Sequence, residues 1–160
     1  MGARFSERTR RLLEISGWSE GRRVLLDQEL PPGSAAGPFL EEFGALVVDV
    51  PRGGLVVPCR FDLVKHPVRD VYPRRDDELW QALTALSGSP LTPVGEQGGS
   101  ILLLMSHEGR VFSVDDLWSF VGVIGQTPDE ALEHLFAPEL VLRGYTIEDD
   151  GSLTWESRDQ

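Results

Sequence analysis

The sequence predicts an α+β fold with a mixed, mostly antiparallel sheet and helices packed mainly on one face. Segments with strand-like hydrophobicity come in runs, and the helices cluster between them instead of alternating strictly with strands. Residues 101–106 are apolar on both faces, as expected of a central strand. The length of 160 residues and the hydrophobic content of 41% predict one domain over residues 1–160.

Four helices are expected, each with a recognisable start or stop. Ser6 can cap a first helix that extends to Ser16, and Gly17 can end it in a left-handed turn. A second helix is expected over residues 35–43, with Gly44 as its stop. A third should begin at Asp76 or Asp77 and end at Gly88, and the fourth follows the capping box Thr127-Pro128-Asp129-Glu130.

The remaining segments predict strands and loops. Residues 65–75 and 87–100, which are rich in proline, glycine or mixed charge, are expected to form loops. Residues 137–160 should contain a terminal hairpin over 145–156 that turns at Asp149-Asp150-Gly151. The other strands are expected over residues 45–50, 55–63, 101–106, 110–114 and 117–124.

Composition excludes several classes of protein. With one cysteine, Cys59, the chain can form neither an intrachain disulfide nor a thiolate zinc cluster. Its longest apolar run, residues 101–105, is far shorter than the roughly 20 residues of a membrane-spanning helix. No apolar segment follows the N-terminal charges as in a secretory signal, so we expect a cytoplasmic protein.

The net charge of −11 is distributed unevenly along the chain. Residues 1–75 carry 12 basic and 10 acidic side chains, whereas residues 76–160 carry 3 and 16. An acidic half repels nucleic acid and acidic membranes and attracts cationic partners. We therefore expect neither nucleic acid nor membrane as a partner. An acidic surface that serves solubility alone would explain the same charge.

No arrangement of residues predicts an active site, a metal site or a cofactor. The three histidines, His66, His107 and His134, lack metal-ligand spacing. Aspartate pairs at 76–77, 115–116 and 149–150 could hold a divalent cation, which makes a small metal-dependent hydrolase one alternative. Aspartates at turns and helix starts also accept hydrogen bonds from backbone amides, and this explanation needs no metal.

Acidic residues at predicted turns and element ends suggest a surface for binding a partner. Binding residues concentrate on the loops of a rigid scaffold, and turns at one side of a sheet can form one surface. Trp118 could place an aromatic anchor inside the acidic rim, or it could pack into the core as a strand residue. The acidic candidates are Asp76, Asp77 and Glu78 at a helix start, Glu96 in a glycine-rich loop, and Glu108, Asp115 and Asp116 in turns.

Several short motifs follow one another in a recognisable order. They are Gly17-Trp18, Gly21-Arg22, FLEEFGAL at 39–46, Pro93-Val94-Gly95-Glu96, Gly109-Arg110-Val111 and residues 125–135 with Glu130-Ala131-Leu132. This order resembles the third family of the SUKH superfamily of bacterial immunity proteins, most clearly over residues 11–135. Ala45 departs from the pattern, because the family usually has a second glycine there.

The resemblance implies a non-catalytic α+β protein that binds and neutralises a cognate secreted toxin, often a nuclease or a nucleic-acid deaminase. Five matching residues, Gly17, Trp18, Arg22, Phe43 and Gly44, are interpreted as fold-forming. An acidic half could occupy the basic cleft of such a toxin. A non-catalytic adaptor of the same fold is the alternative, and the sequence specifies neither the toxin nor the oligomeric state.

Overall fold

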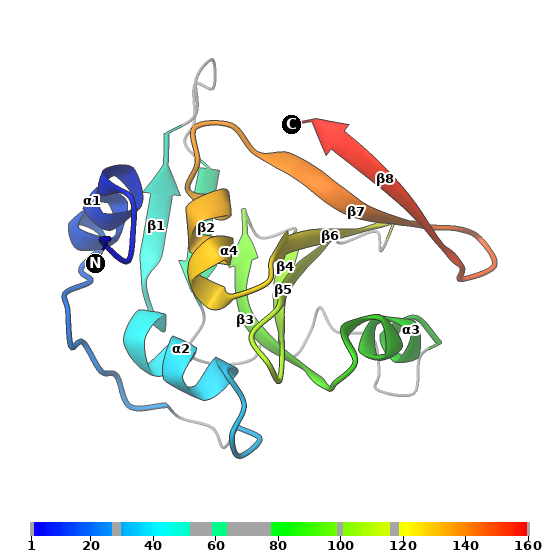
Figure 1. The fold of residues 1–160 in the computed structure, drawn as a ribbon, viewed down its shortest axis with the longest axis horizontal. Helices are drawn as coiled ribbons and strands as arrows, with labels where there is room; N and C mark the ends of the chain where they lie inside the picture. Colours follow the sequence, from blue (N-terminus) through cyan, green and yellow to red (C-terminus); the bar gives the residue numbers. More distant parts are fainter. Residues whose placement is uncertain are drawn as a thin grey trace.

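The structure is a computed structural model that describes residues 2–26, 30–51, 59–63, 78–98, 101–115 and 119–159 (Figure 1). Within these residues, eight strands form one sheet whose spatial order is the order of the sequence, and each described pairing is antiparallel. The predicted α+β class is confirmed, and the described pairings give an antiparallel meander without a parallel pair.

The helices and strands have the following bounds. The helices are α1 (Glu7–Ile15), α2 (Ala36–Phe43), α3 (Glu78–Ser87) and α4 (Pro128–Leu135). The strands are β1 (Val47–Val50), β2 (Cys59–Leu63), β3 (Leu91–Gln97), β4 (Ile101–Ser106), β5 (Val111–Asp115), β6 (Phe120–Gly125), β7 (Val141–Ile147) and β8 (Leu153–Asp159).

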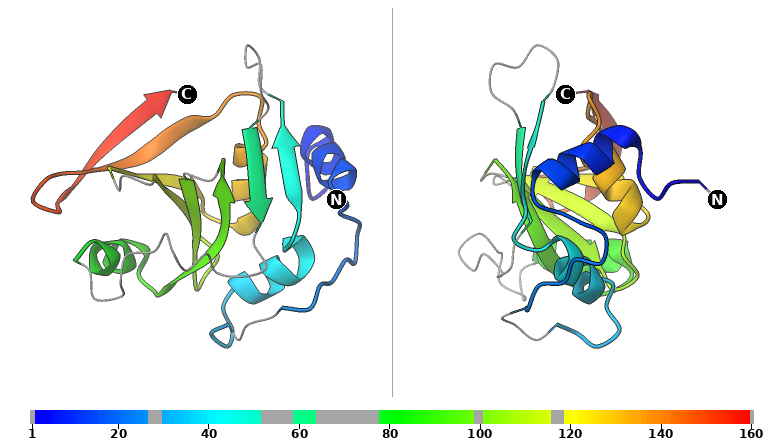
Figure 2. Two further views of the ribbon diagram at one scale, coloured as in Figure 1. Left: turned by 180° about the vertical axis from the view of Figure 1, so that it is seen from behind. Right: turned by 90° about the vertical axis from the view of Figure 1, so that its left-hand side faces the viewer.

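The two faces of the sheet build separate hydrophobic cores, because successive strand residues point to opposite faces. In β4, Leu103 and Met105 pack with residues of α1, α2 and α4, whereas Leu102 and Leu104 pack with α3. Figure 2 shows α1 and α4 on the same side of the sheet. The helices therefore lie mainly on one face, as predicted.

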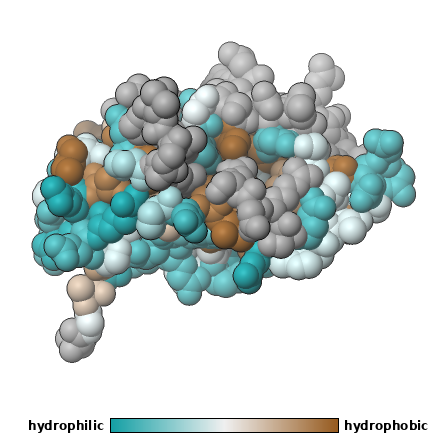
Figure 3. Space-filling view, turned by 90° about the horizontal axis from the view of Figure 1, so that it is seen from above, coloured by the Kyte–Doolittle hydropathy of each residue, from teal (hydrophilic) through white to brown (hydrophobic). Residues whose placement is uncertain are grey.

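Helix α1 begins and ends where its sequence predicts. The Ser6 hydroxyl accepts a hydrogen bond from the Thr9 amide at 3.2 Å, which caps the helix. Gly17 follows with a φ of +105°, a left-handed conformation that glycine adopts without strain. Thr9 and Leu13 face the core, whereas Ile15 is 73% exposed. The surface at the left-hand end of the molecule, where α1 lies, carries many hydrophilic side chains beside a few apolar ones (Figure 3).

Helix α2 ends at Phe43 with Gly44 as its stop, as predicted, and a left-handed conformation follows one residue later. Gly44 has a φ of −57°, and the left-handed residue is Ala45, with a φ of +65°. Gly44 has a different requirement, since a Cβ atom there would lie 2.3 Å from the carbonyl oxygen of Leu40. A left-handed conformation costs an L-residue about 1–2 kcal/mol, so Ala45 is a strained position.

The predicted loop over residues 87–100 is wrong in its central part, where Leu91–Gln97 forms β3 between β2 and β4. The register shifts between Pro93 and Gly95, which accommodates the proline in a β-bulge. Leu91, Thr92 and Val94 are buried. Pairing and burial on both sides override a local composition that favours turns.

The second half otherwise follows the predicted order of elements. Beyond β6 the capping box forms, with the Thr127 hydroxyl accepting from the Glu130 amide at 3.2 Å. The terminal hairpin is longer than expected, because β7 and β8 pair over seven positions around a turn in which Gly151 has a φ of +82°. The expected features at 55–58, 65–75 and 117–118 lie outside the described residues.

Candidate partner-binding surface

The residues predicted to bind a partner separate into three groups in the structure. Four lie outside the described residues, namely Asp76, Asp77, Asp116 and Trp118, and Glu78 is the first residue of α3. The structure places Glu96, Glu108 and Asp115, and Glu96 lies in β3 instead of a loop.

Glu96, Glu108 and Asp115 do not all lie at the same end of the sheet. Glu96 is opposite Leu102 in the strand register, and the neighbouring Ile101 is opposite Asp115, so Glu96 and Asp115 lie toward the same end of the sheet. Glu108 lies in the turn between β4 and β5, at the other end of both strands. The expectation that these turns form a single surface is therefore wrong for Glu108.

Asp115 has partners within the fold. Its carboxylate accepts a hydrogen bond from the Ser119 amide at 2.7 Å and a short one from the Ser119 hydroxyl. Asp115 ends β5, and these two bonds connect it to Ser119, the residue that precedes β6. Replacing this carboxylate would therefore remove contacts within the fold as well as surface charge.

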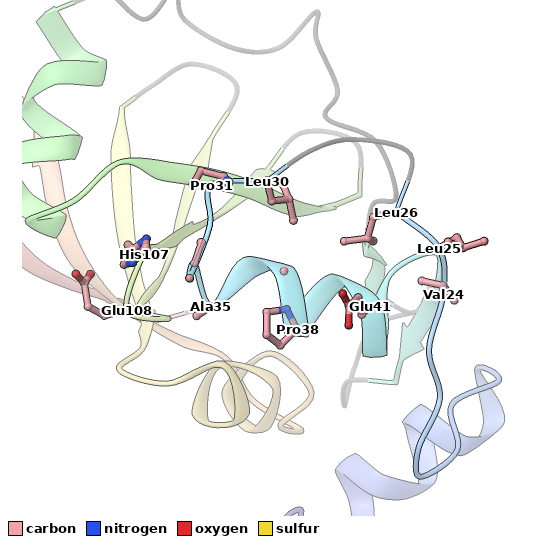
Figure 4. Close-up of a pocket in the computed structure, with 13 residues that line it drawn as sticks. Val24, Leu25, Leu26, Leu30, Pro31, Ala35, Pro38, Glu41, His107 and Glu108 are labelled. Atoms are coloured by element: carbon pink, nitrogen blue, oxygen red, sulfur yellow. The ribbon is translucent and has the colours of Figure 1, made fainter.

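Glu108 is exposed and borders an open groove of about 840 Å³ (Figure 4). Hydrogen bonds from its own backbone amide and from the Ser89 hydroxyl, at 2.9 Å, lower the pKa of its carboxyl. Glu41 of α2 lies on the same groove, whose apolar lining comes mainly from residues 24–26, 30–31 and Pro38.

Backbone hydrogen bonds hold the two walls of this groove. The Val24 amide donates to the Glu41 carbonyl at 2.7 Å, and the Ala35 amide donates to the His107 carbonyl at 2.9 Å. Leu25 projects outward and is 86% exposed. An open groove with apolar walls and two carboxylates is suited to basic and apolar side chains of a macromolecule.

Acidic side chains of α4 form hydrogen bonds and an ion pair with the N-terminal segment, which the sequence did not predict. Arg4 donates to Glu42 at 2.7 Å and to both oxygens of Asp129 at 2.8 and 2.9 Å, and it stacks over the Phe5 ring. The hydrogen bond to Asp129 is the main reason that the pKa of Arg4 is raised. Arg4 and Asp129 are 125 residues apart, so no local pattern identifies the pair.

Glu133 of α4 connects two helices through one carboxylate. It accepts hydrogen bonds from the Ser6 amide at 2.6 Å, the Ser6 hydroxyl at 2.8 Å and the buried Thr9 hydroxyl at 2.9 Å. Together with the Arg4–Asp129 pair, these contacts attach the N-terminal segment to α4. Asp129 of the acidic second half is matched by a cation of the first half, whereas the donors to Glu133 are uncharged.

The five residues interpreted as fold-forming lie around the end of α2. The Trp18 ring is 7% exposed and stacks on Phe43 with 6.4 Å between ring centroids, and its indole nitrogen donates to Glu42 at 3.1 Å. Arg22 donates to the carbonyls of Glu42 at 2.6 Å and Gly44 at 3.0 Å. Arg22 thereby satisfies two carbonyl groups at the helix C-terminus.

His134, a residue type often used in catalysis, contacts backbone groups of two strands. The two ring nitrogens of His134 lie 2.9 Å from the carbonyl oxygens of Ile124 and Val141, so this ring joins α4 to β6 and β7. Within the described ranges, no group of three or more His, Cys, Asp or Glu side chains is arranged to hold a metal ion. None of the helices in those ranges has the length and apolar character needed to span a membrane.

These features define the chain as a small α+β protein with an open surface groove. The model of the SUKH-3 immunity protein family matches residues 5–137. The chain therefore belongs to the SUKH-3 immunity protein family, which confirms the resemblance seen in its motifs. Such proteins are generally non-catalytic, and membership implies a cognate toxin as the partner. Comparisons with curated proteins and with solved structures gave no match.

Proposed function

We propose that this protein neutralises, in the cytoplasm, a toxin that acts on nucleic acid, such as a nuclease or a nucleic-acid deaminase. The observation that carries the proposal is the acidic second half, with 16 acidic and 3 basic side chains after residue 75. Enzymes that bind nucleic acid have basic clefts, because they contact phosphates. An acidic inhibitor is the electrostatic complement of such a cleft.

The acidic side chains act by steering the toxin toward the immunity protein. Asp129 and Glu133 bond to the N-terminal segment, whereas Glu108 is exposed at the groove. Exposed charges contribute little to folding, but they raise the rate at which a basic partner arrives, up to about 10⁸ M⁻¹s⁻¹ or more at low salt. Glu108 therefore combines an accessible charge with a surface on which a protein can dock.

Co-expression tests the neutralisation itself. The probe is the toxin domain encoded beside this gene, induced in cells with and without the full-length immunity protein and scored by survival. We expect survival with the immunity protein and death without it, and purified toxin should cleave or deaminate nucleic acid. Death in both strains, or a toxin with another substrate class, would overturn the proposal.

Association kinetics test the steering mechanism. With the inactivated toxin domain, Glu108→Lys should slow association about 3- to 10-fold at low salt and flatten its salt dependence. Glu20→Lys is the matched control, because Glu20 is also exposed but lies outside the groove. Identical rates and salt slopes for Glu108→Lys and the parent would contradict the acidic-surface mechanism.

A further inference from the structure

The β7–β8 hairpin lies beyond the region that the family model covers, which ends at residue 137. β8 is the last strand in the order of the sheet, and the hairpin projects away from α1 and α2 (Figure 1). Residues 141–159 contain five acidic and two basic side chains. The hairpin is thus an acidic edge of the sheet outside the part shared with the family.

The hairpin carries an aromatic pair of which one ring is exposed and the other partly buried. Trp155 of β8 is 55% exposed, and it lies opposite Tyr145 of β7 in the strand register. The two rings meet edge to face with 5.0 Å between their centroids. Tryptophan and tyrosine are enriched among the residues that contribute most to binding energy, because they bury a large area with little loss of side-chain freedom.

The aromatic pair stands on a rigid support. Leu140 and Leu142 are buried in the core that also contains residues of α1, α2 and α4, and this packing fixes the start of β7. A Cβ atom at Gly144 would lie 1.8 Å from the Val121 carbonyl oxygen, so the backbones of β7 and β6 are in close contact there. A ring held on a well-packed strand loses little conformational entropy when a partner covers it.

The charges of the hairpin turn indicate the chemistry of the partner. Glu148 and Asp149 are exposed in the hairpin turn, and Asp150 accepts hydrogen bonds from the amide and hydroxyl of Ser152, which lower the pKa of its carboxyl. Arg143 is exposed on the ring-bearing face of β7, two residues before Tyr145 and on the side away from the turn. A hairpin with an aromatic pair along its strands and acidic side chains at its turn complements a protein surface with apolar and basic groups.

We propose that the β7–β8 hairpin is the anchoring contact for the toxin, with Trp155 and Tyr145 covered by the toxin surface and Glu148 and Asp149 facing its basic side chains. This inference rests on the proposed function. Steering by charge changes association, whereas the loss of a buried aromatic contact chiefly changes dissociation. The two roles can therefore be measured separately.

The experiment measures association and dissociation of the inactivated toxin domain encoded beside this gene, with full-length immunity protein. Trp155→Ala should dissociate about 30-fold faster with little change in association, as expected for a residue at the centre of an interface. Asp149→Lys should dissociate about 10-fold faster. The control is Ile15→Ala, an exposed apolar residue on α1, which should behave as the parent. Thermal melting verifies that each variant is folded.

The outcomes separate this inference from the proposed function. If the parent binds and protects but Trp155→Ala and Asp149→Lys dissociate at the parental rate, the hairpin assignment is overturned and the proposed function stands. If the parent does not bind the toxin domain, both are overturned. If the parent forms a dimer that Trp155→Ala abolishes, a second copy covers the rings and the toxin assignment is overturned.

Discussion

Two tryptophans illustrate how differently the helix-covered face and the terminal hairpin use the same side chain. Trp18 is enclosed by Phe5 and Phe43, and its indole nitrogen donates to Glu42. Trp155 contacts Tyr145 and leaves more than half of its surface exposed. An indole with a satisfied nitrogen and an enclosed ring stabilises the fold, whereas an exposed ring on an edge strand is available to a partner.

The carboxylates of the two regions differ in the same way. Asp129 pairs with the guanidinium group of Arg4, and Glu133 accepts hydrogen bonds from Ser6 and Thr9, so both carboxylates have partners within the molecule. Glu148 and Asp149 are exposed at the tip of the hairpin. Net charge alone does not distinguish these groups, and the comparison shows that location decides which acidic residues can reach a partner.

The largest expected effect separates the two tryptophans. Trp18→Ala should lower the free energy of unfolding by about 3–5 kcal/mol, because it removes a buried ring and leaves a cavity. Trp155→Ala should change it by about 0.5 kcal/mol or less, since the ring is exposed. Denaturant unfolding of both variants measures the difference. Similar losses of stability would remove the distinction between a structural and an accessible tryptophan.

The next effect tests the carboxylate that joins α4 to α1. Glu133→Ala should lower the free energy of unfolding by about 2 kcal/mol, because the buried Thr9 hydroxyl loses its acceptor. Glu139→Ala is the matched control, since Glu139 is exposed just beyond α4. Both variants remove one negative charge, so equal unfolding curves would show that the hydrogen bonds of Glu133 contribute nothing measurable.

Two substitutions in the turn after α2 should have smaller effects on stability, and these effects should be opposite in sign. Ala45→Gly should raise the free energy of unfolding by about 1 kcal/mol, because it relieves a left-handed alanine. Gly44→Ala should lower it, because the new Cβ atom would approach the Leu40 carbonyl oxygen. Thermal melting compares the two. A loss of stability in Ala45→Gly would show that the left-handed conformation carries no strain.

The smallest effect concerns the hairpin turn. Ser152→Ala should raise the pKa of Asp150 toward its ordinary value, because the hydroxyl no longer donates to the carboxylate. In the parent, any stabilisation from this contact is present above the ordinary pKa and is lost as the pH falls through the lowered value. Carboxyl NMR titration measures the shift, with Glu108 as an internal control. An unchanged Asp150 midpoint would contradict this contact.

The sequence predicted the helix caps and turns that depend on residues only a few positions apart. Ser6 and Thr127 cap their helices through bonds to amides three residues away, and Gly17 supplies a left-handed turn. The order of short motifs was sufficient to indicate the family. The acidic charge of the second half was also readable directly, together with the expectation of a cationic partner.

Tertiary structure decided everything that depends on residues distant in the sequence. Leu91–Gln97 became a strand because β2 and β4 pair with it on both sides, despite its proline and glycine. Arg4 found Asp129 across 125 residues, and the fold placed Glu108 and Asp115 at opposite ends of β5. A local pattern reports short-range preferences, whereas pairing, burial and charge matching depend on which segments the fold brings together.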